Sequence, residues 1–322
     1  MTKPQCRRIA VIGGGANDEH AISLASASAI VRALRAVPGH TAVPLTIGMN
    51  GGWFDEAGVS LPAHQAVKVL TSCDAAFPAL HGVHGEDGAI AGFLDLCGVP
   101  FVGSPVRAGA LGMDKHATKL IARSLGILTA NAYPVETPSD AAVHDLKPPF
   151  VVKPSNGGSS NGVFVVTKVD GIHHAVRRAR EFGDPVLIEE YVSGREVDIA
   201  VFRDRHGEFR IGASLAIGVA TGSVFGTSEK YDGSARFTVP APIDRDNEAK
   251  IRAAAVALYE ALGCAGVARF DFFVTDHGPV LNEVNTAPGM TECSQVPLMY
   301  AAIGLDYAAL IAELLDAVIT KP

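Results

Sequence analysis

Short apolar runs alternate with helical patterns over the first hundred residues. The runs have the length of buried strands and span residues 9–12, 41–48, 75–80 and 99–103. Apolar residues between them recur at helical spacing, and Asp18 stands where it could cap the first helix. Such alternation is typical of a parallel sheet flanked by helices. We therefore predict an N-terminal parallel α/β domain over residues 1–105.

The pattern changes beyond residue 105, where apolar runs become direct neighbours. A helical pattern precedes two adjacent strand-like runs, and a second helix and strand follow them. The remaining chain mixes strands, a long helix and a hairpin pattern over residues 267–285. Adjacent strands interspersed with helices indicate α+β architecture. We predict a small central lobe over residues 106–200 and a C-terminal lobe over residues 201–322.

A segment rich in glycine and serine, KPSNGGSSNGV, lies directly between two strand-like runs at residues 153–163. It is not a Walker A loop, because Val163 stands where that motif requires lysine. The dinucleotide fingerprint fails too, since Asp18 occupies the place of its third glycine. A loop whose backbone N–H groups surround an anion remains possible, with Lys153 adding positive charge. A plain hairpin tip is the alternative interpretation.

The C-terminal hairpin pattern brings acidic residues together. If it folds around His277, Asp271 lies opposite Glu283, and Arg269 and Asn285 share their face. Carboxylates about 5 Å apart repel by about 3 kcal/mol at an effective dielectric of 20. Oxygen ligands without His or Cys favour Mg²⁺ or Mn²⁺ bound jointly with phosphate. A register shifted by one residue, which would turn one carboxylate to solvent, is the alternative.

Composition excludes several functional classes. The net charge of −7 argues against nucleic acid as the main partner. No apolar run approaches the 18 residues of a membrane span, so no membrane partner is expected. Five scattered cysteines without a C-x-x-C pair favour free thiols in a reducing cytoplasm. The stretch HGVHGEDG at residues 81–88 lacks the H-E-x-x-H spacing of a zinc site, so a turn lining a substrate pocket is favoured.

Eight motifs, taken together and in order, resemble those of the D-alanine–D-alanine ligases of the ATP-grasp superfamily. They are GGGANDEH, HGVHGEDG, MDK, KPSNGGSSNGV, EEYVSGRE, KYDG, ARFDFF and NEVNTAPGMT. The resemblance spans nearly the whole chain. It implies an ATP-grasp fold in which the N-terminal (pre-ATP-grasp) domain precedes two α+β lobes. ATP would lie between the second and third lobes, the amino acids would lie between the first and third, and the glycine-rich segment would close over the phosphates.

The resemblance implies a cytoplasmic, homodimeric enzyme that supplies peptidoglycan precursors. ATP phosphorylates the carboxylate of one D-alanine, and the amine of a second D-alanine attacks the acyl phosphate. Asp271, Glu283 and Asn285 match the family's magnesium ligands. The residues that match its ATP-binding positions are Lys115, Lys153, Ser160, Glu189, Glu190, Glu196 and Lys230.

Other matches concern the two amino acids. Glu19 matches the partner of the first amino group, Ser159 and Tyr231 match the residues that position it, and His81 matches a neighbour of that substrate. For the second substrate and the oxyanion, the matching positions are Ser294, Arg269 and the N–H of Gly289.

The chain also departs from the family pattern. Asn17 stands where a serine is usual before the glutamate, and the loop before Lys230, in the stretch FGTSEKY, lacks the usual aromatic residues. These differences leave open a relative that acts on D-serine or another amino acid, or that closes a ring within one molecule. A nucleotide-binding regulator without turnover is a further alternative, although such a protein would not need Glu19, Ser159 or Arg269.

Overall fold

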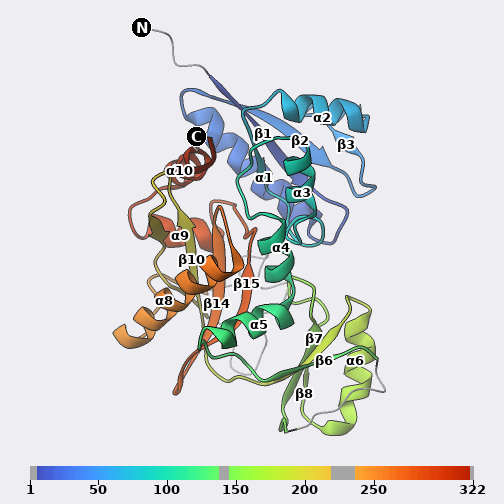
Figure 1. The fold of residues 1–322 in the computed structure, drawn as a ribbon, viewed down its shortest axis with the longest axis vertical. Coiled ribbons are helices and arrows are strands. Elements are labelled where there is room, and N and C mark those ends of the chain that lie inside the picture. The colour runs from blue at the N-terminus through green and yellow to red at the C-terminus, as the bar shows by residue number, and fades with distance from the viewer. Residues whose placement is uncertain (1–5, 138–144, 219–235, 320–322) are drawn as a thin grey trace.

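The computed structural model describes residues 6–137, 145–218 and 236–319, which form three separate sheets. Figure 1 shows the first sheet at one end of the molecule and the second at the other. The third sheet, which comes last in the chain, lies between them. This arrangement places the C-terminal sheet in contact range of both other lobes.

The first sheet has the strand order β4–β3–β2–β1–β5 and is parallel at its centre, as predicted. Its two short edge strands are antiparallel, and the run expected as a strand at residues 99–103 forms only a bridge between Phe101 and Ala76. Its elements are β1 (Arg7–Gly14), α1 (His20–Ala36), β2 (His40–Ile47), β3 (Trp53–Phe54), β4 (Ser60–Leu61), α2 (Ala63–Thr71), β5 (Ala75–Pro78) and α3 (Ala89–Leu96).

The second sheet is antiparallel, has the order β6–β9–β7–β8 and carries its own hydrophobic core beneath α6. Its elements are β6 (Ala132–Val135), β7 (Phe150–Pro154), β8 (Phe164–Val166), a 3₁₀ turn (Val169–Gly171), α6 (Ile172–Arg180) and β9 (Val186–Glu190). The glycine-rich segment connects β7 to its antiparallel neighbour β8, so the predicted loop between two strands is confirmed.

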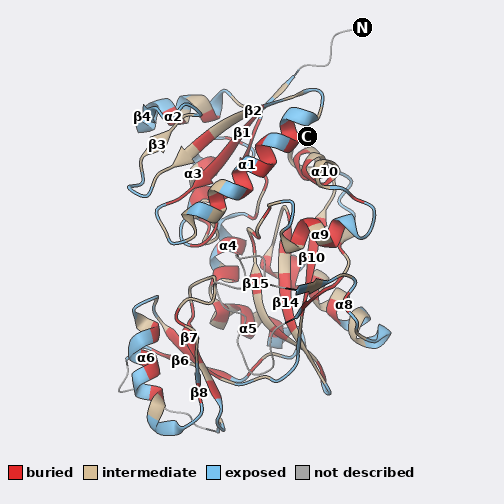
Figure 2. Cartoon of the chain, turned by 180° about the vertical axis from the view of Figure 1, so that it is seen from behind, coloured by how far each residue is buried: buried red, intermediate tan, exposed pale blue. Residues whose placement is uncertain are grey.

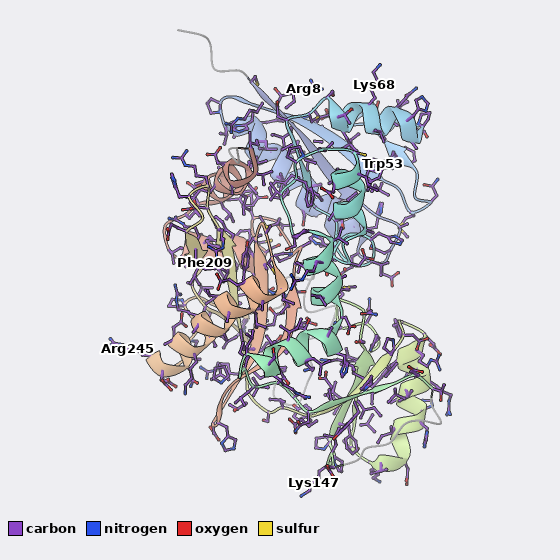
Figure 3. All side chains as sticks on the ribbon, in the orientation of Figure 1. Arg8, Trp53, Lys68, Lys147, Phe209 and Arg245 are labelled. Carbon is purple, nitrogen blue, oxygen red and sulfur yellow. The ribbon has the colours of Figure 1, made fainter. Side chains whose placement is uncertain are left out.

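The third sheet has the order β13–β12–β10–β14–β15, with β11 paired to β10, and all its pairs are antiparallel. Phe209, labelled in Figure 3, meets Tyr259 of α8 edge-on, and Arg245 marks the first residue of that helix. The elements are β10 (Arg195–Arg203), β11 (Phe209–Ile211), β12 (Leu215–Gly218), β13 (Arg236–Thr238), α8 (Arg245–Leu262), β14 (Ala268–Thr275), β15 (Gly278–Asn285) and α9 (Gln295–Ala301).

One strand crosses a domain boundary expected from the sequence, and three helices pack against a lobe other than the one in which they were expected. The boundary at residue 200 falls inside β10, and α4 (Val106–Met113) and α5 (Lys115–Ser124) pack on the third sheet through Leu111 and Ala122. The last helix, α10 (Tyr307–Ile319), packs against α1. Buried residues, red in Figure 2, continue from the first lobe into the third. These two lobes therefore share one hydrophobic cluster in addition to a cluster of their own, whereas the second lobe has only a separate one.

Within the described residues, none of the helices combines the length and the apolar character that crossing a membrane requires.

Gly109 of α4 marks the closest approach of the helix to the loop before α3. A Cβ at this position would lie 2.7 Å from the carbonyl oxygen of Glu86 and 2.7 Å from the amide nitrogen of Gly88. We expect Gly109→Ala to lower the free energy of unfolding by about 1–3 kcal/mol, because backbone must move. This loss should outweigh the gain of about 1 kcal/mol in helix propensity. Urea unfolding monitored by circular dichroism measures it.

Gly92→Ala in α3 is the matched control. There the new Cβ would meet only a methyl group of Val106, at 3.3 Å, and that side chain can shift. Equal unfolding free energies for the two variants would contradict the close backbone approach.

Candidate active site

A cavity of about 430 Å³ lies between the second and third sheets. Its walls come from β7, β9 and the glycine-rich segment on one side, and from α5, β10, β14 and β15 on the other. Among the residues matched to ATP-binding positions, every one that the structure describes lines this cavity: Lys115, Lys153, Ser160, Glu189, Glu190 and Glu196. Lys230 and Tyr231 lie outside the described residues.

Helix α5 contributes two lysines, Lys115 and Lys119, one helical turn apart on the same face. The Nζ atom of Lys115 lies 3.3 Å from Glu283 of the third sheet and also donates to the carbonyl of Gly157 in the glycine-rich segment. Lys119 Nζ lies 3.3 Å from Glu189 of the second sheet. The helix therefore pairs with a carboxylate from each wall, which fixes both carboxylates relative to one another. Its start is capped by Asp114, whose side chain accepts the amides of residues 116 and 117.

Glu189 is shared between two lysines. Its second carboxylate oxygen lies 3.0 Å from Lys153 Nζ, and its side chain is only 4% exposed. Burial alone would raise the pKa of this carboxyl group, but Lys119 and Lys153 outweigh burial and lower it. Burial lowers the pKa of Lys119 to about 8, although Glu189 opposes this shift. The neighbouring Glu190 accepts hydrogen bonds from the backbone and side-chain nitrogens of Asn131, so its carboxylate is engaged within its own lobe.

The β14–β15 hairpin pairs Asp271 with Glu283, as predicted, but reaches that register differently. Its turn is closed by Thr275 and Gly278, so it is not centred on His277. That turn alone would leave Asp271 opposite residue 282. A bulge beside Asp271 inserts Asn282 as an unpaired residue and restores the pairing. Asn282 and Glu283 consequently both line the cavity.

Asp271 is surrounded by donors. Arg269 donates to both of its oxygens at 2.7 Å, and Asn285 donates to one at 3.0 Å. Asp198 of β10 pairs with Asp271 across the sheet and lies 3.6 Å from the Arg269 guanidinium group. Arg269 is thus held in one orientation by carboxylates on two strands.

The potential metal ligands on this face of the β14–β15 hairpin suit a hard cation. Two carboxylates and one amide, from Asp271, Glu283 and Asn285, supply only oxygen ligands, as Mg²⁺ or Mn²⁺ prefers. No group of three or more His, Cys, Asp or Glu side chains arranged to hold a metal occurs among the described residues. A cation here would accordingly need further oxygen atoms, such as those of a phosphate.

The first lobe meets the glycine-rich segment at Glu19. Ser159 donates a hydrogen bond to Glu19 Oε1, and a Cβ on Gly158 would lie 3.5 Å from the same carboxylate. Ser159 and Ser160 both adopt left-handed backbone conformations, with φ of 54° and 59°. A non-glycine residue in this conformation costs about 1–3 kcal/mol, and the conformation persists only where the surrounding structure holds it. The segment is therefore held closed against the first lobe in this structure.

Glu19 itself is placed by Asn17. Asn17 accepts the amide of Glu19 and donates to the carbonyls of His81 and Val83. The expectation that Asp18 caps α1 is wrong, because Glu19 is the N-cap residue and its side chain caps nothing.

His81 has both ring nitrogens engaged by the protein. Since Nδ1 lies 2.8 Å from the carbonyl of Ala287, it carries the proton, and Nε2 then accepts from Ser26 at 2.9 Å. Ser26 in turn accepts the amide of Met290 at 3.2 Å. Burial lowers the pKa of His81, which favours this neutral form. The His81–Ser26 pair thus holds the backbone on both sides of Gly289.

Beyond Gly289, Ser294 precedes α9. Its hydroxyl lies 2.6 Å from that of Thr291 and would lie 3.2 Å from a Cβ on Gly289, so the two matched positions are neighbours. Gln295, the first residue of α9, donates to Asp198 at 2.7 Å. The residue matched to the second substrate is thereby connected to the sheet that carries Arg269.

Sequence reasoning missed Ser26, Lys119 and Asn282, and it placed Glu86 only within the turn at residues 81–88. Glu86 lies 4.0 Å from His81, and burial followed by repulsion from Glu19 raises its pKa to about 8. At neutral pH Glu86 is therefore mostly protonated. Lys119 lies four residues after Lys115 in a helical pattern, which is a signal that could have been used. No local signal identifies Ser26 or the bulge at Asn282.

We expect Ser26→Ala to lower the free energy of unfolding by about 1–3 kcal/mol, because it leaves buried His81 Nε2 and the Met290 amide without their partner. Chemical denaturation followed by intrinsic fluorescence measures the change. Ser28→Ala is the matched control, since Ser28 is exposed on the same helix and only accepts from Arg32. The assignment of the His81–Ser26 pair is refuted if both variants have the same stability.

The chain is similar in sequence to known protein families and in architecture to solved structures. The family described as D-ala D-ala ligase N-terminus matches residues 56–104, and that described as D-ala D-ala ligase C-terminus matches residues 127–316. A D-alanine–D-alanine ligase from Rhodococcus opacus is 36% identical, with 100% of this chain and 99% of the relative covered.

Two solved structures illustrate the likeness. The VanG D-Ala:D-Ser ligase from Enterococcus faecalis superposes with a TM-score of 0.83 at 31% identity, covering 97% of this chain and 99% of that one. The D-alanine–D-alanine ligase from Bacillus anthracis, solved in complex with ATP, gives a TM-score of 0.80 at 28% identity and covers 97% of both chains. Together with the family matches and the cavity between the second and third lobes, these similarities show that the chain belongs to the D-alanine–D-alanine ligase family, with the ATP-grasp fold.

Proposed function

We propose that this protein is an ATP-dependent ligase that joins two D-alanine molecules through an acyl-phosphate intermediate. The observation that carries the proposal is that a cavity and a closed glycine-rich segment lie next to each other. The cavity lined by Lys115, Lys153 and Glu283 supports nucleotide binding, and the Glu19–Ser159 contact closes the glycine-rich segment beside it. A regulator without turnover would need only the first feature.

Binding of the first D-alanine depends on charge. Its ammonium group pairs with Glu19, which Asn17 and Ser159 hold in place. Its carboxylate then lies near Arg269, so that the γ-phosphoryl group of ATP can be transferred to a carboxylate oxygen. Lys115 and Lys153 stabilise the phosphate charge as it moves. Tyr231 would complete the positioning of the ammonium group.

The second step forms the peptide bond. The amine of the second D-alanine attacks the acyl carbon, and a tetrahedral intermediate with a negative oxygen results. Arg269 and the Gly289 N–H stabilise that oxygen, and phosphate then leaves. Asp198 and Asp271 fix Arg269, while His81 and Ser26 fix the loop around Gly289. Ser294 contacts the carboxylate of the second D-alanine.

Asp271, Glu283 and Asn285 would hold Mg²⁺ or Mn²⁺. When bound, the cation would neutralise phosphate charge during transfer. Arg269 holds Asp271 in position and Lys115 holds Glu283.

We expect Glu283→Gln to raise the Mg²⁺ concentration needed for half-maximal ADP release by at least about tenfold, because one anionic ligand is lost. Titration of Mg²⁺ in a coupled ADP assay measures the effect. Glu208→Gln, at an exposed position in the turn between β10 and β11, serves as the control. A variant with unaltered Mg²⁺ dependence would remove Glu283 from the metal site.

D-Serine is the second candidate for the second substrate. The likeness to a D-Ala:D-Ser ligase at 31% identity favours it, as do the departures at Asn17 and in the loop before Tyr231. For D-alanine, the 36% identity to D-alanine–D-alanine ligases over the whole chain weighs more.

A panel of amino acids separates these possibilities. We expect ADP and phosphate release with D-alanine alone, at a rate at least about tenfold above the rate with L-alanine, with D-alanyl-D-alanine as the product identified by mass spectrometry. Release that requires D-alanine together with D-serine would support the second candidate. Absence of release with every amino acid would refute a ligase of this class.

D-Alanyl-D-alanine is a building block of peptidoglycan, so the proposed role is precursor supply in the cytoplasm. A homodimer is proposed from family resemblance.

A further inference from the structure

Lys119 is buried in the wall of the nucleotide cavity, and the reaction described above does not use it. Its side chain is 2% exposed, less than the side chains of Lys115 and Lys153, which are 10% and 7% exposed. Its ammonium group contacts one carboxylate, Glu189, at 3.3 Å. That contact lacks hydrogen-bond geometry, and Lys119 Nζ has no other hydrogen-bond partner among the described residues.

Burying an ammonium group is unfavourable. The penalty is several kcal/mol even after relaxation, and one ionic contact of this geometry offsets only part of it. An unbranched apolar side chain such as methionine would fill the same space without that penalty. The positive charge of Lys119 therefore has a role that packing does not explain.

The charges around Glu189 indicate what that role is. Lys119 lies beside one carboxylate oxygen of Glu189 and Lys153 beside the other, so this group of three carries a net charge of +1. Lys153 also donates to Asn282 on the opposite wall. Without Lys119, Glu189 would neutralise Lys153, and this part of the cavity would present no net charge to a polyanion.

We propose that Lys119 is a positioning residue that serves as the counter-ion of Glu189 and thereby leaves the charge of Lys153 available to the phosphates of the nucleotide. This inference rests on the proposed nucleotide site and adds a residue to it. Lys119 itself contacts the carboxylate and acts on the nucleotide through Lys153.

The test is the affinity for a non-hydrolysable ATP analogue, measured by isothermal titration calorimetry on the full chain. Lys119→Met should raise the dissociation constant about tenfold, which corresponds to about 1.4 kcal/mol. Lys119→Arg keeps the charge and should bind within about threefold of the wild type. Lys68→Met, the same substitution at an exposed lysine of α2, should change nothing.

The double variant Lys119→Met/Glu189→Gln separates a charge effect from a packing effect. It restores the net charge of +1, so the analogue should bind at least about threefold more tightly than it binds Lys119→Met alone. A purely structural role for Lys119 predicts no such recovery. If Lys119→Met does not fold, Lys119→Gln takes its place with the same expected weakening and the same rescue.

The possible outcomes distinguish this inference from the proposed function. A wild-type protein that does not bind the analogue would refute the nucleotide site itself. A wild type that binds, with Lys119→Met binding equally well, would refute only the role of Lys119. Failure of Glu189→Gln to rescue the lysine variant would also refute it.

Discussion

The pairing of a buried and a half-buried carboxylate with lysines from another element determines how the lobes of this protein meet. Glu189 belongs to the second sheet and Glu283 to the third, and each is paired with a lysine on one face of α5. A carboxylate in a poorly solvated wall is strongly unfavourable unless it is paired, so neither sheet can shift far from this helix without leaving a charge uncompensated. The cavity between the sheets is therefore bounded by groups whose positions are set electrostatically. The same groups line the cavity proposed to bind the nucleotide, so the interactions that define its walls also set the charge that a ligand there would meet.

A second set of contacts connects the first lobe to that cavity. Glu19 accepts from Ser159 of the glycine-rich segment, while His81 and Ser26 hold the backbone around Gly289. The first and third lobes also share a hydrophobic core, so the loop at Gly289 lies at a junction supported by packing and by hydrogen bonds. The second lobe has a separate core and reaches the first through the segment that follows β7. A polar contact, rather than a shared core, joins the glycine-rich segment to the first lobe.

Much of this arrangement follows from local sequence patterns. The alternation of strands and helices predicted the central parallel strands of the first sheet, and apolar runs on both sides of the glycine-rich segment predicted a loop between strands. The pair of Asp271 with Glu283 was predicted from a turn at His277 that the hairpin does not have; the bulge at Asn282 compensates for the shorter turn. Sequence spacing cannot reveal a bulge, because the inserted residue changes the register without leaving a periodic signal. The last helix could not be assigned to the first lobe either, since its partner α1 is almost three hundred residues away.

The sequence by itself determined the type of the main helices and strands, the order of the motifs and the chemical groups available for the site, because periodicity, glycine content and side-chain chemistry are local properties. Only the tertiary structure decided which of those groups neutralise one another. It placed Lys119 beside Glu189 and hydrogen-bonded the two ring nitrogens of His81 to Ser26 and to the Ala287 carbonyl. It also raised the pKa of Glu86 through burial next to Glu19. The physical reason is that burial and charge pairing depend on distances between segments remote in the chain, and those distances exist only after the lobes have packed together.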